Sequence, residues 1–502
     1  MSIPYIEFKN TPHFVVNDQP FLALAGEVHN SSCSSMTYFE EKVLSRIQDI
    51  PLNTLLLPIY FEDVEKEEGV YCIEKVQQMI DRCRQYDYKI IFLWYGLWKN
   101  GLSTYIPQWM KLDRDTYPFC RQENQKPLYT ISPLCQKAIE KDAKAIQQVM
   151  SFIKKYDAIE QTVIMLQIEN EVGLLESDRD YSSAANLLFH QDIPEDLQTF
   201  TQQKGTWQDV FLSSAPEMFM AYHYAKAIET IASSLKQVYP LPLMMNAWIK
   251  KENELPGKYP SGGPIIENIH IYQAFAPSID VFAPDIYVDT FEQVCDAYAK
   301  PGVLAIPETR QDILSMSHII YAIANYPLIC FSPFGIEDFY GESESSRLLD
   351  FLTTLGIDKK AFRAEGSYPY LCQIYHDLQT MIPLLLQYRG TSHIYPFIQT
   401  DSQYDSFEIG DIHVKVIYLS RENQPKGVGF VIFDGQQYYV YGINMMLSFS
   451  HEQKEVALLN LEEGCFQDGQ WQSLRILNGD ERYNVYILDQ PQMLSFQLHS
   501  FE

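Results

Sequence analysis

The sequence predicts an α/β protein in which a (β/α)8 TIM barrel is followed by a small antiparallel β-sandwich domain. Three observations support this fold class. Short apolar runs alternate with helical patterns up to about residue 390, short alternating strands follow, and two of the apolar runs end directly in a glutamate. A barrel strand covered by helices is apolar on every side, so its first polar residue marks its carboxyl end. The active sites of barrel enzymes lie at that end of the strands.

Eight runs of β-prone apolar residues are the predicted barrel strands. They are residues 21–25, 54–58, 89–94, 162–167, 242–246, 280–284, 302–306 and 328–332. Helical patterns such as 70–86 and 216–239 lie between them. Strands that alternate with helices in this way form a parallel barrel. On this count Glu171 follows the fourth strand and Glu308 follows the seventh.

The last part of the chain predicts a second domain. Alternating strands occur at residues 413–418, 427–433 and 438–441, with turn signals at Asp434-Gly435 and Asn478-Gly479. We therefore expect a catalytic barrel over residues 1–390 and an antiparallel β domain over residues 391–502. The helical stretch 369–388 is expected to pack beneath the barrel before the chain crosses over.

Residues 173–205 form the most loop-like stretch of the predicted barrel. The stretch is too long for an ordinary connection between a strand and a helix, and its position after strand four places it over the cleft. Acidic and aromatic residues alternate there. We expect it to wall the pocket or to reach a neighbouring subunit.

Composition narrows the classes of partner. The 502 residues allow one barrel of roughly 250 to 400 residues and a smaller module. The aromatic content of 14% is high and suits clefts that bind sugars, although a single ring is more often core. The net charge of −27, without a stripe of Lys and Arg, argues against nucleic acid. Such a charge otherwise mainly keeps a protein soluble.

The nine cysteines predict neither a disulfide framework nor a zinc site, because they are odd in number, scattered and never in CxxC spacing. Several lie in apolar stretches, as Cys330 does, which favours a reducing compartment.

The start of the chain lacks the pattern of a signal peptide, and no run reaches 18 apolar residues. We expect a soluble, cytoplasmic protein without a membrane partner.

Glu171 and Glu308 are the predicted catalytic pair. Glu171 lies in Gln167-Ile-Glu-Asn-Glu-Val-Gly173, and Glu308 lies in Val303-Leu-Ala-Ile-Pro-Glu-Thr-Arg310. Cleaving a glycosidic bond needs one carboxylic acid to protonate the leaving oxygen and a second carboxylate on the opposite face of the anomeric carbon. We predict that Glu171 is the acid/base and Glu308 the nucleophile. The alternative is that both are strand-end acids in ion pairs.

Glu169 competes with Glu171 for the acid/base role, because strand alternation turns residues two apart to the same side. The Asn-Glu pairing favours Glu171, since the amide of Asn170 can bond the sugar 2-hydroxyl as positive charge develops. Tyr287, at the end of strand six, is expected to orient Glu308 and to keep it ionised by donating a hydrogen bond.

Further candidates for substrate binding lie beyond the other strands. Glu27 and His29, after strand one, are expected to bind sugar hydroxyls at the floor of the pocket, or to bond neighbouring loops. Trp94 and Trp98, at the end of strand three, suit a stacking platform, with core packing as the alternative for at least one of them.

Asn246 and Trp248, which flank the end of strand five, are likewise expected either to contact the substrate or to pack in the core. Glu337 and Asp338, after strand eight, are equally well read as surface acids.

The Asn-Glu after strand four and the Glu after strand seven resemble the retaining (β/α)8 glycoside hydrolases with a "four/seven" arrangement. Four further stretches are similar to the bacterial branch of glycoside hydrolase family 35, β-galactosidases with a small C-terminal β domain. These stretches are residues 22–30, 52–60, 94–100 and 331–335. The resemblance covers essentially the whole chain. It implies an exo-acting β-galactosidase with the two roles given above and no metal or cofactor, and it adds Tyr60 and Phe334 to the candidate substrate-binding residues.

The sequence departs from this family at Phe61, where Trp is usual, and at Lys66, where Pro is usual. These departures do not affect the barrel prediction, but they leave the identity of the preferred sugar undecided. Alternatives are the same chemistry on a β-glucoside, a β-glucosaminide or an α-L-arabinopyranoside, and a non-catalytic carbohydrate-binding protein. We also expect a homo-oligomer, a dimer or a trimer, formed through the edges of the β module.

Overall fold

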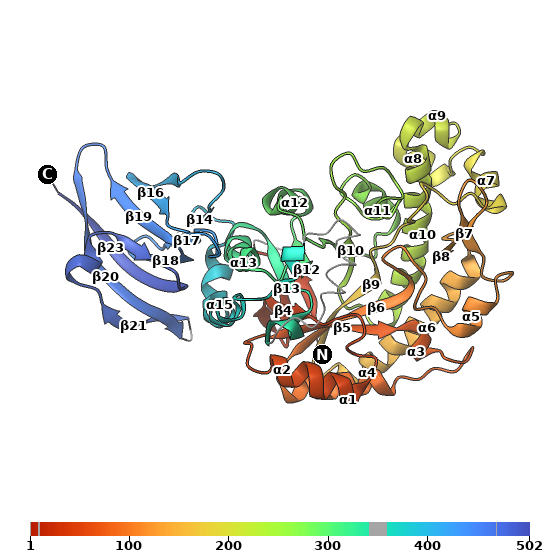
Figure 1. The fold of residues 1–502 in the computed structure, drawn as a ribbon, viewed down its shortest axis with the longest axis horizontal. Helices are drawn as coiled ribbons and strands as arrows, with labels where there is room; N and C mark the ends of the chain where they lie inside the picture. Colours follow the sequence, from red (N-terminus) through yellow and green to blue (C-terminus); the bar gives the residue numbers. More distant parts are fainter. Residues whose placement is uncertain (1, 9–10, 341–358, 468, 502) are drawn as a thin grey trace.

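A closed parallel barrel forms the centre of the computed structural model, which describes residues 2–8, 11–340, 359–467 and 469–501 (Figure 1). Each predicted run overlaps one barrel strand, so the predicted barrel is confirmed. The strands are β4 (Ala23–Glu27), β5 (Thr54–Tyr60), β6 (Lys89–Lys99), β9 (Val163–Asn170), β10 (Leu243–Ala247), β11 (Val281–Pro284), β12 (Leu304–Thr309) and β13 (Leu328–Pro333).

The order of the strands around the barrel is β11-β10-β9-β6-β5-β4-β13-β12, and an isolated bridge just beyond β11 joins the two ends of this order. Ile286 pairs with Thr309 there, and its amide donates to the carbonyl of Glu308 at 2.9 Å. Every residue of β4, β5, β9, β10, β11, β12 and β13 is buried. Helices bury the outer face of these strands, and side chains inside the barrel bury the inner face, which explains the apolar runs.

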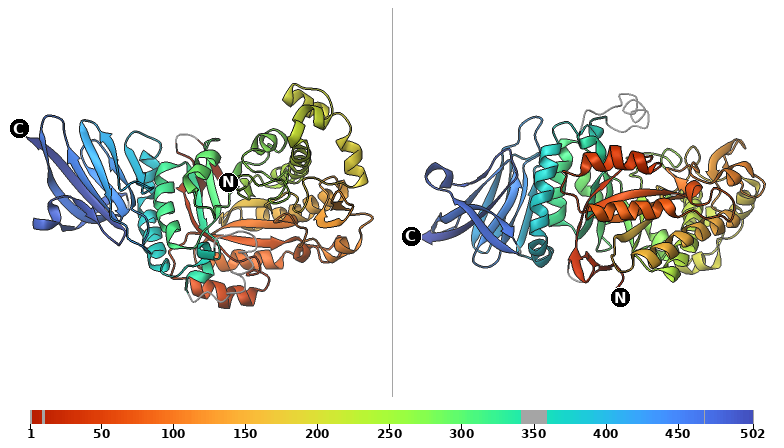
Figure 2. Two further views of the ribbon diagram at one scale, coloured as in Figure 1. Left: turned by 45° about the horizontal axis from the view of Figure 1, so that its top comes forward. Right: turned by 90° about the horizontal axis from the view of Figure 1, so that it is seen from below.

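Helices surround the barrel on its outer side (Figure 2). The predicted helices 70–86 and 216–239 correspond to α4 and α10. On α6 the buried residues recur every three or four positions, as Ala138, Asp142 and Ala145 do, so one face of that helix packs on the sheet. The main helices of this layer are α4 (Glu74–Gln85), α6 (Gln136–Asp157), α10 (Ala215–Val238), α11 (Ile269–Phe275), α12 (Phe291–Tyr298) and α13 (Ile313–Asn325).

Shorter elements complete the barrel region. A three-stranded sheet comes before β4, a helical segment follows it, and a two-stranded sheet follows α5. These elements are β1 (Tyr5–Glu7), β2 (His13–Val16), β3 (Gln19–Phe21), α1 (Met36–Tyr38), η1 (Phe39–Leu44), α2 (Ser45–Ile47), α3 (Phe61–Val64), α5 (Gln108–Leu112), β7 (Phe119–Arg121), β8 (Pro127–Ile131), η3 (Ile336–Tyr340) and η4 (Lys359–Phe362).

The stretch 173–205 is not a loop throughout, in contrast to the prediction. It contains α7 (Ser183–Phe189) and α8 (Glu195–Thr201), and α9 (Trp207–Phe211) and η2 (Leu212–Ser214) follow it. These helices are too short to be stable alone, so tertiary packing stabilises them. The Arg179 guanidinium lies over Tyr181 at 3.8 Å and over Phe189 at 4.1 Å, and Phe189 meets Phe219 of α10 edge to face.

The C-terminal part is a sandwich of two antiparallel sheets, as predicted (Figure 1). The larger sheet has the order β14 (Ile394–Ile398), β17 (Val428–Phe433), β18 (Tyr438–Ile443), β23 (Gln492–Phe501), β20 (Glu455–Gln467), β21 (Gln470–Ile476). The smaller has the order β15 (Tyr404–Ile409), β16 (Ile412–Tyr418), β19 (Met445–Ser450), β22 (Val485–Ile487), and η5 (Gly479–Arg482) precedes β22. Apolar side chains such as Val414, Leu447 and Phe496 fill the space between the sheets.

Helix α15 (Tyr368–Tyr388) connects the two parts. The Tyr375 hydroxyl donates to the carbonyls of Ala25 in β4 and Phe331 in β13, at 2.8 and 3.2 Å. On the other side, the Tyr441 hydroxyl of β18 donates to Asp377 at 3.0 Å. The helix therefore lies between barrel and sandwich rather than beneath the barrel (Figure 1).

The predicted domain boundary at residue 390 falls in the turn that joins α15 to β14. None of the helices in the described part of the chain combines the length and apolar character that crossing a bilayer requires.

Candidate active site

The ends of β9 and β12 bring Glu171 and Glu308 into one site. Each side chain is 7% exposed. Burial and then the charge of Glu308 raise the pKa of Glu171 to about 7. Glu308 instead accepts hydrogen bonds, from the Tyr287 hydroxyl to Oε2 at 2.8 Å and from the Asn170 amide to Oε1 at 3.5 Å. The site thus holds one carboxyl that keeps a proton and one carboxyl surrounded by donors.

The backbone at the end of β9 separates Glu171 from Glu169. Both residues have left-handed φ angles, 57° at Glu169 and 43° at Glu171, which break the alternation of the strand. Glu169 accepts from the amides of Leu97 and Trp98 at 3.0 and 2.8 Å. The amide of Glu171 donates to Asn246 at 2.9 Å. The expectation that Glu169 and Glu171 face the same side is therefore wrong.

Lys99 is a part of the site that the sequence analysis missed. It ends β6, five residues beyond the predicted end of that strand, and its side chain is buried. Its ammonium group donates to Asn170 Oδ1 at 2.7 Å, which leaves the Nδ2 group of Asn170 to face Glu308. The positive charge of Lys99 also lowers the pKa of Glu171 and of Glu27, against the effect of burial.

Replacing Lys99 by Met is expected to shift the alkaline limb of the pH–kcat/KM profile to higher pH. Removal of a positive charge raises the pKa of Glu171, so its proton is retained longer as pH rises. The lost bond to Asn170 should also lower kcat/KM by about tenfold, since a hydrogen bond to a charged group contributes roughly 1.5–3 kcal/mol.

The control is Lys89→Met, at the opposite end of the same strand. This variant should leave the alkaline limb of the pH–kcat/KM profile and the value of kcat/KM unchanged. An alkaline limb that stays unshifted in Lys99→Met would contradict the assignment.

Glu27 lies at the floor of the site and is 1% exposed. Neither of its carboxyl oxygens has a hydrogen-bond partner among the described residues. Burial, followed by the charge of Glu308, raises its pKa well above the usual range. A buried polar group without a partner is costly, about 1–3 kcal/mol, so these oxygens are well suited to donors that a ligand brings.

His29, beside this floor, is held by two acids. Its Nε2 lies 2.7 Å from Asp338, and its amide donates to Glu337 at 3.1 Å. Burial lowers the pKa of His29, but the bond to Asp338 and the charge of Glu337 outweigh it and raise the pKa overall. Glu337 is buried and also accepts from Ser32 at 2.5 Å, so it is not a surface acid.

Asn246 connects the acid/base to a third carboxyl group. Its Oδ1 accepts from the Glu171 amide, and its Nδ2 donates to Asp285 at 2.7 Å. Asp285 also lies within hydrogen-bonding reach of the Glu171 side chain. Burial and then the charges of Glu308 and Glu171 raise the pKa of Asp285 well above its usual range. Sequence reasoning missed Asp285, although it stands two residues before Tyr287.

The structure does not support a stacking platform at Trp94 and Trp98, because both indoles are fully buried. Trp94 donates to Asp142 at 2.8 Å, and Trp98 donates to a backbone carbonyl of β8 at 2.9 Å. Trp248, by contrast, is only half-buried. Of the three tryptophans, Trp248 alone offers a face to a ligand.

Aromatic rings line the Glu308 side of the site. Tyr287 stacks on Phe362 with ring centres 5.1 Å apart, and Phe334 meets Phe362 edge to face at 6.5 Å. His29 meets Phe334 at 5.1 Å. The hydroxyl of Tyr60 donates to a backbone carbonyl at 2.6 Å, so this group is already engaged. Phe362 lies outside every predicted strand, so no sequence pattern marked it as part of the site.

No group of three or more His, Cys, Asp or Glu side chains is arranged to hold a metal ion within residues 2–8, 11–340, 359–467 and 469–501.

Comparison of the sequence with known families gives one match. Residues 371–487 match a family described as a domain of unknown function (DUF5597), which spans most of α15 and of the β-sandwich. No curated protein matches the sequence significantly.

Solved structures with a similar fold include several glycoside hydrolases. Gan42B, a GH42 β-galactosidase, aligns with a TM-score of 0.50 at 11% identity over 95% of this chain and 98% of its own. A catalytic mutant of Gan42B from G. stearothermophilus gives a TM-score of 0.49 at 11% identity, with the same coverage. The β-galactosidase of Marinomonas ef1 gives 0.49 at 10% identity over 72% of this chain.

The chain spans 60% of the Marinomonas enzyme and 57% of a similar β-galactosidase from Bacillus circulans sp. alkalophilus. At 11% identity the alignment with Gan42B over nearly the whole chain shows a shared fold. The structures named are β-galactosidases, two of them from family GH42, and family 35 is not among them.

Proposed function

We propose that the protein is a retaining exo-acting glycoside hydrolase that releases terminal β-galactose from oligosaccharides or glycosides. The observation that carries the proposal is the contrast between its two central glutamates. Burial and a neighbouring charge raise the pKa of Glu171 to about 7, whereas Glu308 accepts hydrogen bonds from Tyr287 and Asn170. An acid and a nucleophile need this difference at neutral pH.

In the first step, a Glu308 oxygen forms a bond to the anomeric carbon while the bond to the leaving oxygen breaks. The proton of Glu171 passes to that oxygen, so the aglycone leaves as a neutral alcohol. The negative charge of Glu308 disappears in the new ester bond. This loss of charge lowers the pKa of Glu171, because that charge had helped to raise it.

In the second step, the Glu171 carboxylate takes a proton from water while the water oxygen bonds to the anomeric carbon. The ester bond to Glu308 breaks, and its electron pair returns to the carboxylate. Two inversions give net retention, so the released sugar is the β-anomer. Both glutamates return to their starting states.

The surrounding residues suit the binding of one terminal sugar. The two oxygens of Glu27 that lack partners among the described residues are available to sugar hydroxyls, and the Nδ2 group of Asn170, 3.5 Å from Glu308, can donate to the 2-hydroxyl. Glu171 and Glu308 are each only 7% exposed, which favours a chain end over the interior of a polymer. These features support exo action.

The departure from family 35 at Phe61 does not alter this pocket. Phe61 is fully buried and packs against Trp94 with ring centres 5.7 Å apart, so it belongs to the core. Lys66 is exposed, and its ammonium group lies 3.7 Å from Asp63. Neither residue argues for a change of sugar.

The proposal is tested by hydrolysis of p-nitrophenyl β-galactoside, β-glucoside, β-glucosaminide, β-fucoside and α-L-arabinopyranoside. We expect the β-galactoside to have the highest kcat/KM, and proton NMR to detect β-galactose before mutarotation. A preference for another glycoside would keep the mechanism and change the sugar. A first-formed α-anomer would contradict the retaining mechanism, and inertness on the whole panel would favour a carbohydrate-binding protein.

A further inference from the structure

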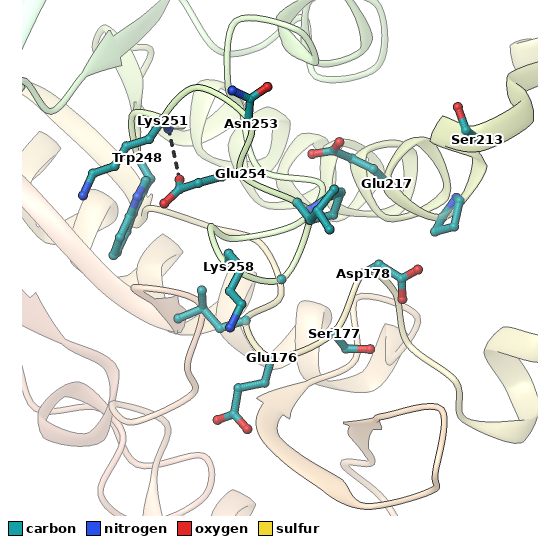
Figure 3. Close-up of a pocket in the computed structure, with 15 residues that line it drawn as sticks. Glu176, Ser177, Asp178, Ser213, Glu217, Trp248, Lys251, Asn253, Glu254 and Lys258 are labelled. Atoms are coloured by element: carbon teal, nitrogen blue, oxygen red, sulfur yellow. Dashed lines mark hydrogen bonds between the residues drawn. The ribbon is translucent and has the colours of Figure 1, made fainter. Parts of the chain in front are cut away.

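A cavity of about 1050 Å³ is lined by the loops that follow β9 and β10 and by the start of α10 (Figure 3). One of its walls comes from the loop after β9 and contributes Glu176 and Asp178. A second wall comes from the loop after β10 and contributes Trp248, Glu254 and Lys258, and the start of α10 completes the lining. Neither Glu171 nor Glu308 lines this cavity.

The two loops place the cavity on the Glu171 side of the site. One loop begins directly after Glu171, and the other begins just after Asn246, which accepts from the Glu171 amide. The loops also bond each other. The amide of Glu176 donates to the carbonyl of Gly257 at 2.8 Å, and residues 174 and 261 exchange two backbone hydrogen bonds. The aromatic rings around Glu308 belong instead to segments that follow β11 and β13.

The side of the acid/base is the side of the leaving group. Glu171 protonates the oxygen that links the terminal sugar to the rest of the substrate, so the rest of the substrate must extend past Glu171. A cavity bordered by the loops that follow Glu171 and Asn246 lies on that route.

The size and lining of the cavity indicate what it holds. Pockets of about 300–1000 Å³ enclose drug-sized ligands, so this cavity exceeds what a single sugar ring needs. Its walls carry carboxylates at Glu176, Asp178 and Glu254 and ammonium groups at Lys251 and Lys258. Mixed charges suit hydroxyl groups, which both donate and accept, better than an anionic ligand. The half-buried ring of Trp248 offers a flat apolar face to a pyranose.

We propose that this cavity binds the leaving group of a galactosyl oligosaccharide, two or more neutral sugar residues, with Trp248 as the stacking platform. The proposal rests on the proposed function of the site and extends it to the class of substrate. It predicts an enzyme that hydrolyses small galactosides but prefers the ends of oligosaccharides.

The test compares kcat/KM for p-nitrophenyl β-galactoside with kcat/KM for neutral oligosaccharides of two, three and four residues that end in β-galactose. In the wild type, kcat/KM should rise by about fivefold from the disaccharide to the trisaccharide, as expected for one added stacking contact. In Trp248→Ala, the ratio of trisaccharide to aryl galactoside activity should fall by about fivefold, chiefly through KM, because the stacking contact is lost.

Two further variants separate this effect from a fold defect. Ser213→Trp introduces a bulky ring at an exposed lining position and should lower the same ratio. Trp471→Ala removes a half-buried indole from the distant strand β21 and should leave the ratio unchanged.

Three outcomes count against the proposals, and they differ. A wild type that is indifferent to chain length, or a Trp248→Ala variant that loses both activities equally, would overturn the cavity assignment and leave the hydrolase intact. A wild type that cleaves neither the aryl galactoside nor the oligosaccharides would overturn the proposed function and this inference with it.

Discussion

Glu308→Ala is expected to lower kcat on p-nitrophenyl β-galactoside by roughly 10⁵-fold or more, the scale on which loss of a catalytic nucleophile acts. The variant cannot form the ester bond to the anomeric carbon, and an activated leaving group does not compensate for that loss. The measurement is initial rates at pH 6 to 7 with the aryl galactoside.

Azide is the control for Glu308→Ala. The truncated side chain leaves room for a small anion, which attacks the anomeric carbon from the face that Glu308 occupied. We therefore expect azide to restore part of the rate and to form the α-galactosyl azide. Retention of more than a tenth of the wild-type rate, or formation of the β-azide, would show that Glu308 is not the nucleophile.

The barrel was predictable because its strands are buried, and buried strands appear in the sequence as short apolar runs. Helices cover the outside of the barrel and side chains fill its inside, so most of β5 and the first half of β9 are apolar. The first carboxylates after such runs lie at the carboxyl end of the barrel. For this reason Glu171 and Glu308 could be paired from sequence although they stand far apart along the chain.

The parts of the site that were not predictable depend on backbone geometry and partners. Left-handed φ angles turn Glu169 and Glu171 to different partners, and alternation alone gives no sign of this. The buried lysine at residue 99 was missed because β6 continues five residues past the predicted strand 89–94.

Tertiary contacts also decide which aromatic residues face a ligand. Trp94 and Trp98 look like ligand platforms in sequence, yet their N–H groups find partners inside the protein. The stretch 173–205 lacks a clear helical period, because its helices are short and are stabilised by contacts with residues distant in sequence.

Glu171→Ala is expected to separate substrates by their leaving groups. On an unactivated β-galactoside, kcat/KM should fall by about 10³- to 10⁴-fold, which is the scale of general acid catalysis. On an aryl galactoside whose leaving group needs little protonation, the loss in kcat/KM should be below about tenfold. Azide should then react with the accumulated glycosyl-enzyme and give the β-galactosyl azide, the anomer opposite to that expected with Glu308→Ala.

The pH dependence provides a second test of Glu171. The acid works only while it holds its proton, so the kcat/KM of the wild type on an unactivated galactoside should decline as pH rises through about 7, the pKa of Glu171. Glu171→Ala should lack this alkaline limb, because the group that titrates is gone. Equal losses on activated and unactivated galactosides, or an unchanged limb, would assign the proton to another group, and Asp285 would be the first candidate because its carboxyl lies beside Glu171 with a raised pKa.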